Sequence, residues 1–445
     1  MRLEQGADYL PLTFEEFNEI ICGLNIGAPG KVAVAVSGGG DSMALSYLLN
    51  DWCKTNDIEL VALTVNHGLR ETSTKEATQV AKWFSDEKIE HHILNWRGDK
   101  PESNIQNAAR KARYELMGGW CAANDIAHLF LAHHQDDQAE TFLIRLFRGS
   151  GVDGLSGMRQ VAPLPLKDTQ FEMPCLYRPL LNIPKKRLIE NLKLKDRDWI
   201  NDPSNENTNF TRVNVRNLIN QSKIEGLNSK RISQTAEKLS RVRSFLEEVT
   251  DKADSRYITY HKLGYAVLEA DFFENLHEEI SLRLLSSVLK KIGGGTYGPR
   301  YQKLISLYEN LKNKNFQGQT ILGCNVFPGP QNKIIFVRED DNIEEEIFIT
   351  DKEQYLWDNR IIVKCSGSTG TLKRITSGDL AVIKLKYPEF KNKLKAAIEY
   401  PNLRNRILHT LPCFIRVDHK IIFPEIIADE LDMPELDKFS AVFKN

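Results

Sequence analysis

The chain lacks the cysteine patterns of metal centres and disulfide scaffolds. Its 445 residues include 7 cysteines, which are scattered without any C-x-x-C pair. Isolated cysteines are typical of reduced thiols and disfavour a structural zinc or iron–sulfur site. We therefore expect a protein of the reducing cytoplasm.

Two further absences narrow the class of protein. No apolar run approaches membrane-spanning length, and the first residues lack the basic-then-apolar layout of a signal peptide, so no membrane partner is expected. The net charge is −1, so any surface that binds nucleic acid must be a local patch.

The chain is also too long for one ordinary core, and two or three domains are expected.

The segment VAVAVSGGGDS, residues 32–42, is the most informative feature present. Its five small apolar residues predict a short buried strand, which leads directly into a glycine turn and a helix. Glycines let the backbone approach a ligand, and the N–H groups of a helix N-terminus attract phosphate. The loop lacks the lysine of a Walker motif. It predicts a nucleotide site in which Asp41 could hold Mg²⁺.

Strand and helix patterns alternate through the first part of the chain. Strands are expected at 32–36, 58–68, 89–96 and 126–134, with helices at 74–87 and 104–123. This rhythm predicts a parallel sheet that binds ligands at the carboxyl ends of its strands. The glycine loop, the pair Asn66 and His67, and the pair His133 and His134 all fall at such ends.

The remainder of the chain divides into a loop-rich stretch and two further regions. Residues 155–210 contain many prolines and one basic helix at 184–193. We expect three domains, at 1–225, 226–342 and 343–445, of which the second is mostly helical and the third α+β. The third has strand patterns at 361–366, 381–385 and 413–424, and a basic helix near 388–399.

Acidic residues and histidines gather after the fourth expected strand. They are His133, His134, Asp136, Asp137 and Glu140. Acidic residues in the first turn of a helix often have no ligand, because the helix dipole alone favours them there. Three acids behind two histidines, at the ligand-binding edge of a sheet, fit either a Mg²⁺ site or a site for a cationic amine. Both alternatives stay open from the sequence.

The motifs taken together resemble a known family. SGGGDS is similar to the pyrophosphate loop of the PP-loop ATPases. With VNHGLR (65–70), AARKARYE (108–115) and AHHQDDQAETFLIRLFRGSGVDGL (132–155), it resembles the tRNA(Ile)-lysidine synthetase family. RPLL (178–181) and DPSNENTNFTRVNVRN (202–217) resemble that family's next signature, with the asparagine between Arg212 and Arg216 shifted by one position. WDNR (357–360) and the closing strands resemble the C-terminal domain of its three-domain members.

The resemblance implies a fold and an activity. The fold is a Rossmann-like PP-loop domain, similar to adenine nucleotide α-hydrolases, followed by a mostly helical and an α+β domain that bind tRNA. ATP and Mg²⁺ adenylate the C2 oxygen of the wobble cytidine in the CAU-anticodon tRNA(Ile). The ε-amine of free L-lysine then displaces AMP to form lysidine, which changes the codon read from AUG to AUA. The sequence leaves the oligomeric state open, with a homodimer possible.

The resemblance and the residue chemistry together give an expected role to each site residue. ATP is assigned to Ser37, Gly38, Gly39, Gly40, Asp41, Ser42, Asn66 and His67, and Mg²⁺ to Asp41 and Asp136. Catalysis is assigned to Asp41, Asp136, Asp137, Glu140 and Arg113. Lysine is assigned to Arg110, Arg113, His133, Asp137 and Glu140, because its ammonium groups need acids and its carboxylate needs an arginine.

Two basic stretches are expected to contact tRNA. One lies at 185–197 and the other at 384–416, where eight basic residues face two acids. Such an imbalance in a neutral chain favours phosphate contact over a merely solvated face. The expected tRNA contacts are Lys185, Lys186, Arg187, Arg212, Arg216, Lys391, Lys393, Lys395, Arg404 and Arg406.

Three other functions compete with this interpretation. A PP-loop tRNA thiolase typically needs cysteines that carry sulfur or a cluster, and no C-x-x-C exists here. A small-molecule amidotransferase or NAD synthetase-like ligase leaves the basic C-terminal stretch unexplained. An RNA-binding protein with a degenerate nucleotide site is disfavoured because SGGGDS and HHQDD are both intact.

Overall fold

The computed structural model describes residues 10–68, 72–98, 100–101, 103–166, 173–201, 211–222, 224–295, 297–343, 346–350, 354–364, 369–418, 420–434, 436 and 438–443. By compactness the chain forms two units, residues 1–245 and 246–445. The predicted division into three domains stays a prediction. Among the described residues, no helix is long and apolar enough to cross a membrane.

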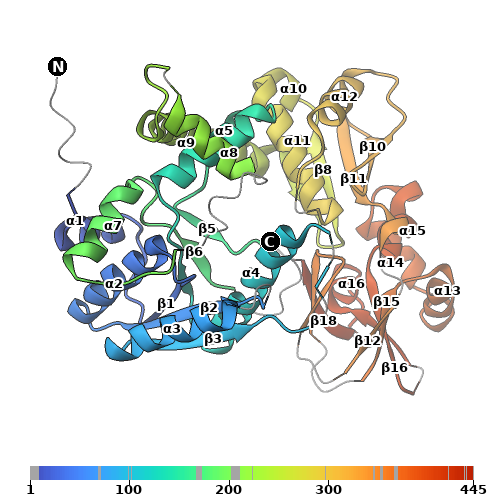
Figure 1. Ribbon diagram of the computed structural model, residues 1–445. Coiled ribbons are helices and arrows are strands. Elements are labelled where there is room, and N and C mark those ends of the chain that lie inside the picture. The colour runs from blue at the N-terminus through green and yellow to red at the C-terminus, as the bar shows by residue number, and fades with distance from the viewer. Residues whose placement is uncertain are drawn as a thin grey trace. The chain divides into compact units, whose positions relative to one another are not determined.

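The first unit is an α/β domain built on a six-stranded sheet (Figure 1). Its strands are β1 (Lys31–Ala35), β2 (Glu59–Asn66), β3 (Glu90–Asn95), β4 (His128–Phe130), β5 (Val161–Pro163) and β6 (Cys175–Tyr177). Its helices are α1 (Phe14–Cys22), α2 (Gly40–Thr55), α3 (Ser73–Asp86), α4 (Ile105–Ala123), α5 (Gln135–Phe147), α6 (Val152–Leu155), α7 (Lys185–Leu194) and α8 (Thr211–Gln221). A long helix, α9 (Ser229–Tyr257), follows.

The four predicted strands form the core of this sheet. The order is β3-β2-β1-β4-β6-β5, in which β1 pairs in parallel with both β2 and β4. The predicted Rossmann-like parallel sheet is therefore confirmed. Two strands lie in the stretch that was predicted to be loop-rich, and one of them, β5, runs antiparallel to β6 at the sheet edge.

Alternating side chains of β1 bury both faces of the sheet. Val32 and Val34 pack with α1, α2, α3 and α7 in one hydrophobic core, and α1, α2 and α7 lie together in Figure 1. Ala33 packs on the opposite face with Tyr114 and Met117 of α4. A strand buried on both faces is apolar throughout, which explains the run VAVAV.

The second unit holds two sheets. The five-stranded sheet is antiparallel, in the order β7-β8-β11-β10-β9. It is built from β7 (Ile258–Tyr260), β8 (Tyr265–Glu269), β9 (Gln319–Ile321), β10 (Cys324–Gly329) and β11 (Lys333–Arg338), and α10 (Phe272–Asn275), α11 (Glu278–Gly293) and α12 (Tyr301–Lys312) accompany it. The helices agree with the sequence pattern, whereas β7 and β8 were not predicted.

The seven-stranded sheet belongs to the C-terminal region, in the order β12-β15-β16-β17-β18-β14-β13. Its strands are β12 (Glu346–Ile349), β13 (Gln354–Trp357), β14 (Ile361–Lys364), β15 (Gly370–Arg374), β16 (Pro412–Arg416), β17 (Ile421–Pro424) and β18 (Lys438–Phe443). The helical segments are η3 (Asp340–Asn342), α13 (Ser377–Lys386), α14 (Phe390–Ala397), η4 (Pro401–Leu403), α15 (Arg404–His409) and α16 (Glu425–Glu430). The strand predicted at 381–385 is wrong, because these residues belong to α13.

Candidate active site

The glycine loop turns between β1 and the N-terminus of α2. The φ angle of Gly38 is +82°, and a Cβ at this position would lie 2.7 Å from Cδ1 of Ile200. Only glycine combines that backbone conformation with so close a contact. The Ser42 hydroxyl donates to the Gly39 carbonyl oxygen at 2.9 Å and accepts the Ser37 N–H at 3.2 Å. The predicted loop is thus closed on itself by its two serines.

A cavity of about 380 Å³ opens beside this loop. Its lining includes Ser37, Gly39, Asp41, Ser42, Asn66, His67, Arg113 and His133. These residues come from the ends of β1, β2 and β4 and from α2 and α4. The structure therefore brings together most of the predicted ATP residues and two of the predicted lysine residues. We call it the nucleotide cavity.

Asp41 lies in the first turn of α2, next to the side chains of Lys185 and His134. Its Oδ2 accepts a hydrogen bond from Lys185 Nζ at 2.9 Å and lies 3.5 Å from His134 Nε2. Burial alone would raise the pKa of Asp41, but His134 and Lys185 outweigh it and lower the pKa to about 2. The carboxylate is therefore ionised at neutral pH. Its Oδ1 is buried and has no hydrogen-bond partner within the described ranges.

His134 begins α5 and connects its acids to Asp41. The Asp136 N–H donates to His134 Nδ1 at 3.2 Å, and the His134 N–H donates to Asp137 Oδ2 at 3.1 Å. This reciprocal cap satisfies two N–H groups of the helix start. Because Nδ1 accepts a hydrogen bond, the imidazole carries its proton on Nε2, which lies 3.5 Å from both Asp41 and Asp137.

A second cavity of about 520 Å³ lies in the same unit. Its lining includes His134, Asp136, Glu140, Lys185, Lys186, Glu190, Lys193 and Arg216. Asp41 lines the nucleotide cavity and its partners Lys185 and His134 line this one. The contacts that Asp41 makes with Lys185 and His134 thus connect the two linings. We call this the basic cavity.

Glu140 provides a buried acid at the basic cavity. Its Oε1 accepts a hydrogen bond from Arg216 Nε at 2.7 Å, while its side chain is only 1% exposed. Burial is the main cause that raises the pKa of Glu140, and Arg216 opposes the shift. The other oxygen, Oε2, is buried without a hydrogen-bond partner among the residues that the structure describes. It is available to a donor from a ligand.

The two histidines that line the nucleotide cavity are held neutral. Burial, with a further contribution from the charge of Arg113, lowers the pKa of His67 to about 4. Burial is also the main cause that lowers the pKa of His133 to about 3, while the charge of Asp137 opposes the shift and nearby arginines add to it. Neutral imidazoles can donate and accept hydrogen bonds to a nucleotide without adding charge.

Several predicted tRNA contacts already have partners within the protein. Lys185 pairs with Asp41, and Arg216 pairs with Glu140. Arg187 donates to the carbonyl oxygens of Leu10 and Pro11 and to Glu16. These contacts hold α7 and α8 against other segments of the first unit. They account for three of the basic residues before any nucleic acid is considered.

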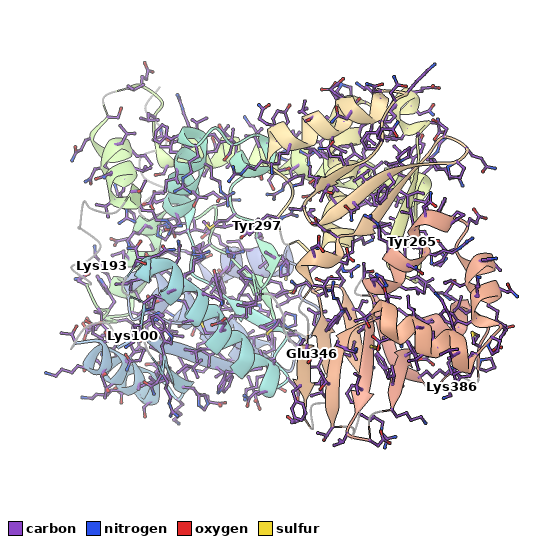
Figure 2. The ribbon with its side chains drawn as sticks, turned by 90° about the vertical axis from the view of Figure 1, so that its right-hand side faces the viewer. Lys100, Lys193, Tyr265, Tyr297, Glu346 and Lys386 are labelled. Atoms are coloured by element: carbon purple, nitrogen blue, oxygen red, sulfur yellow. The ribbon has the colours of Figure 1, made fainter. Side chains whose placement is uncertain are left out.

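The basic residues of the C-terminal region differ in their exposure. Lys391 and Lys395 are exposed on α14, while Lys393 donates to the Asp432 carbonyl oxygen. Arg404 donates to the Ile398 carbonyl oxygen at 2.8 Å, and Arg406 lies over the Phe327 ring. Lys386 is exposed at the end of α13 (Figure 2). Lys391 and Lys395 are thus exposed members of the predicted patch.

Arg110 and Arg212 are not among the residues that line the two cavities. Arg110 is exposed on α4 with its guanidinium over the Tyr114 ring, and Arg212 is exposed on α8. The predicted motif positions 69–70 and 202–210 lie outside the described residues. One buried arginine was missed. Arg178, the first residue of RPLL, donates to the Arg159 carbonyl oxygen at 2.9 Å, and the motif itself was the available signal.

Comparison with known proteins identifies the family of the chain. The PP-loop domain profile matches residues 15–223. The tRNA(Ile)-lysidine synthase of Wolbachia pipientis wMel is 37% identical over 403 residues, which cover 89% of this chain and 89% of that protein. The chain belongs to the tRNA(Ile)-lysidine synthase family. The lysidine synthase of Ruegeria pomeroyi is 36% identical and covers 76% of this chain and 77% of its own length.

Among solved structures, the U34-tRNA thiolase of Methanococcus maripaludis is similar to part of the chain. It covers 51% of this chain and 80% of its own, with 20% identity and a TM-score of 0.42. Membership of the lysidine synthase family makes the protein an enzyme, and its PP-loop domain supports the use of ATP.

Proposed function

We propose that this enzyme joins L-lysine to C2 of the wobble cytidine in a CAU-anticodon tRNA(Ile), through an adenylated cytidine. The names of its relatives supply the tRNA, and the PP-loop domain supplies the use of ATP. The lysine, the cytidine and the intermediate are our proposal. The observation that carries it is Asp41, which lines the nucleotide cavity while its partners Lys185 and His134 line the basic cavity.

The first step is the transfer of AMP. The C2 oxygen of cytidine attacks the α-phosphorus of ATP and pyrophosphate leaves. The N–H groups of the glycine loop and of the α2 N-terminus are oriented to stabilise the negative charge of the phosphates. Arg113 adds a cation from α4. Neutral His67 and His133 complete the lining without repelling Arg113.

The chain also offers a fitting ligand for Mg²⁺. Asp41 is ionised and its buried Oδ1 lacks a protein partner within the part of the chain described. A bound Mg²⁺ would neutralise charge on the phosphate oxygens of ATP. Asp136, the second predicted ligand, lines the basic cavity rather than the nucleotide cavity. We therefore propose Asp41 as the main protein ligand.

The second step is attack by the lysine ε-amine, which displaces AMP from C2. We propose that Asp136 and Glu140, which both line the basic cavity, bind the ammonium groups of lysine. The unpartnered Oε2 of Glu140 at the basic cavity supports this. Asp137 is already engaged as the cap of α5, so we assign it to the orientation of His134. An exposed arginine such as Arg110 would receive the lysine carboxylate.

A thiolase reaction is less well supported. Thiolation would need a cysteine beside the adenylated base, but no cysteine stands among the residues that line either cavity. The described thiols Cys53, Cys121, Cys324 and Cys413 are buried, and burial raises the pKa of each to about 12. Such thiols are poor nucleophiles.

Incubation of the enzyme with bulk tRNA, ATP and labelled lysine tests the proposal. We expect the label in tRNA, with a requirement for ATP and for a CAU-anticodon tRNA(Ile). Initiator methionine tRNA, which has the same anticodon, is the control and should stay unlabelled. Labelled sulfur in the tRNA together with bound iron would instead favour a thiolase. The absence of any lysine incorporation would reject the proposal.

A further inference from the structure

A third cavity lies within the second unit, and all its lining residues follow the PP-loop domain in the sequence. Its volume is about 410 Å³, which is within the range of small-molecule sites. β7, β8 and the end of α11 line one part of it, and α16 and β18 line the other. It contains Tyr260, Tyr265, Ile292, Glu425, Asp429 and Phe443, with Lys262 and Lys291.

The lining includes the aromatic rings of Tyr260, Tyr265 and Phe443. Tyr265 is buried and its ring stacks on that of His261, with 4.4 Å between the centroids, so Tyr260 and Phe443 are the rings left for a ligand to contact. Lys291 Nζ lies over the Tyr260 ring at 4.0 Å from its centroid. Tyr265, the first residue of β8, belongs to the core that includes the C-terminal helices, and Figure 2 shows it where the five-stranded sheet meets the C-terminal region. Gly264 has a φ of +82°, and a Cβ there would lie 2.2 Å from Cζ of Phe443. Because glycine has no Cβ, the Phe443 ring can pack directly against the backbone at residue 264.

The polar groups of the cavity have opposite signs. The Glu425 and Asp429 carboxylates lie 3.7 Å and 3.4 Å from one ammonium, that of Lys438. Two carboxylates that share one cation keep capacity to accept further hydrogen bonds. Lys262 and Lys291 add two ammonium groups to the same lining. The cavity therefore combines flat apolar surfaces, paired acceptors and cations.

We propose that this cavity receives one unpaired guanosine of the tRNA substrate. The inference rests on the proposed function, because that function supplies the RNA. Proteins read unpaired bases by stacking them on aromatic rings and by bonding their edges. Guanine presents two adjacent donors, N1–H and the N2 amino group, which match a carboxylate. Adenine, cytosine and uracil present no such adjacent pair, and a lysine can contact the attached phosphate.

Nucleotide binding to the full-length enzyme tests the base preference. Equilibrium dialysis with GMP, AMP, CMP and UMP is carried out with excess α,β-methylene-ATP, which occupies the nucleotide cavity. We expect GMP to bind at least about tenfold more tightly than the others, the effect of one charge-assisted bidentate contact. Equal binding of the four nucleotides, or no binding of GMP, would overturn the proposal.

Substitution of the acids assigns that binding to the cavity. Glu425→Gln with Asp429→Asn should weaken GMP binding about tenfold and abolish the preference. Glu389→Gln with Asp418→Asn is the matched control, since both acids are exposed and neither lines the cavity. Tight binding of GMP to the acid double variant would overturn the proposal. Circular dichroism shows whether each variant is folded.

Lysine incorporation separates this inference from the function on which it rests. In the acid double variant we expect the KM for tRNA to rise about tenfold while kcat is kept. An unchanged KM would reject the guanosine site and leave the proposed function intact. If the wild-type enzyme incorporates no lysine, the proposed function fails, and dialysis with GMP still decides whether the cavity binds guanine.

Discussion

Lys185 and Asp41 are 144 residues apart in the chain, and the Lys185 Nζ lies 2.9 Å from the Asp41 Oδ2. The pair joins the first residue of α7 to the first turn of α2. Both helices contribute to one hydrophobic core, in which Leu188 and Leu192 pack with Leu45 and Leu49. The packing of these apolar faces therefore sets the position of a charge at the nucleotide loop.

Asp41→Asn should abolish adenylation and leave the fold intact. The substitution removes the charge that Lys185, His134 and the proposed Mg²⁺ all face, without a change in side-chain volume. The measurement is formation of adenylated tRNA in the absence of lysine. Asp51→Asn, on the same helix and paired with Lys195, is the control and should adenylate normally. Normal adenylation by Asp41→Asn would reject its role.

Lys185→Met should reduce adenylation while tRNA binding keeps its salt dependence. The lysine pairs with Asp41, so its loss removes the ammonium group that neutralises this carboxylate. Lys195→Met is the control, because Lys195 directly follows the last residue of α7, the helix that Lys185 begins. A normal rate of adenylation in Lys185→Met, with a flatter salt dependence of tRNA binding, would instead support the tRNA contact expected from the sequence.

Glu140→Gln should raise the KM for lysine more than it slows adenylation. A lost charge-assisted hydrogen bond costs about 1.5–3 kcal/mol, which is roughly a tenfold to hundredfold change in apparent affinity. Asp137→Asn is compared in the same assays, because its carboxylate caps α5. Asp137→Asn should lower the melting temperature of the protein, because it removes this cap. If Glu140→Gln blocks adenylation and leaves the lysine KM unchanged, the acid serves the first step.

Charge reversal at Lys391 and Lys395 should weaken tRNA binding and flatten its salt dependence. Both side chains are exposed on α14, and a protein that neutralises fewer phosphates releases fewer counterions when it binds. Lys393 is left unchanged because it bonds to Asp432. Binding of tRNA(Ile) is measured across a salt series, and ATP binding is the control. Superimposable curves would mean that tRNA is held elsewhere.

The stability of the first unit should fall as the pH is lowered from about 6.5 to about 4. Burial lowers the pKa of His91 to about 4 from its ordinary value of 6.5, so the unfolded chain binds its proton first. His91 contributes stability above pH 6.5 and loses it as the pH falls towards its folded pKa. His91→Gln should remove on the order of 2 kcal/mol of this pH dependence. Urea unfolding at pH 4.5 and 7 measures it, and parallel losses in both proteins would contradict the assignment.

The central strands and the nucleotide loop were predictable because their signals are local. An apolar run followed by glycines defines β1 and the loop, and the alternation of strands and helices defines β2, β3 and β4. β5 and β6 were missed because each has only three residues within a proline-rich stretch. Such short strands are specified by their neighbours in the sheet rather than by their own composition.

The segment 381–385 shows how a local pattern can mislead. Its β-branched residues favoured a strand, but Leu380 and Ile383 are buried while Val382 and Leu385 are exposed. That spacing is helical. The better signal was the capping box of Thr376 and Asp379, in which each side chain bonds to the other's backbone N–H. Apolar exposure on α13 made the period hard to recognise.

The candidate site was predicted in its components but not in its pairings. Asp41 and the cluster after β4 were expected at one sheet edge and meet there through His134. The pairs formed by Lys185 with Asp41 and by Arg216 with Glu140 were not expected, because charge patterns along a chain do not identify distant partners. Lysines and arginines that the sequence predicts to form a surface patch can therefore instead pair with the carboxylates of the candidate site.

The contact between Ile200 and Gly38 has a consequence for the order in which the enzyme matures. The Ile200 N–H donates to the Gly38 carbonyl oxygen at 2.8 Å. The loop that begins at residue 37 therefore contacts Ile200, a residue that the ribosome adds much later. A nascent chain that ends before residue 200 has the glycines and the strand but lacks this backbone restraint. Contacts of such long sequence separation form late, so ATP binding should be acquired only after α7 has emerged and docked.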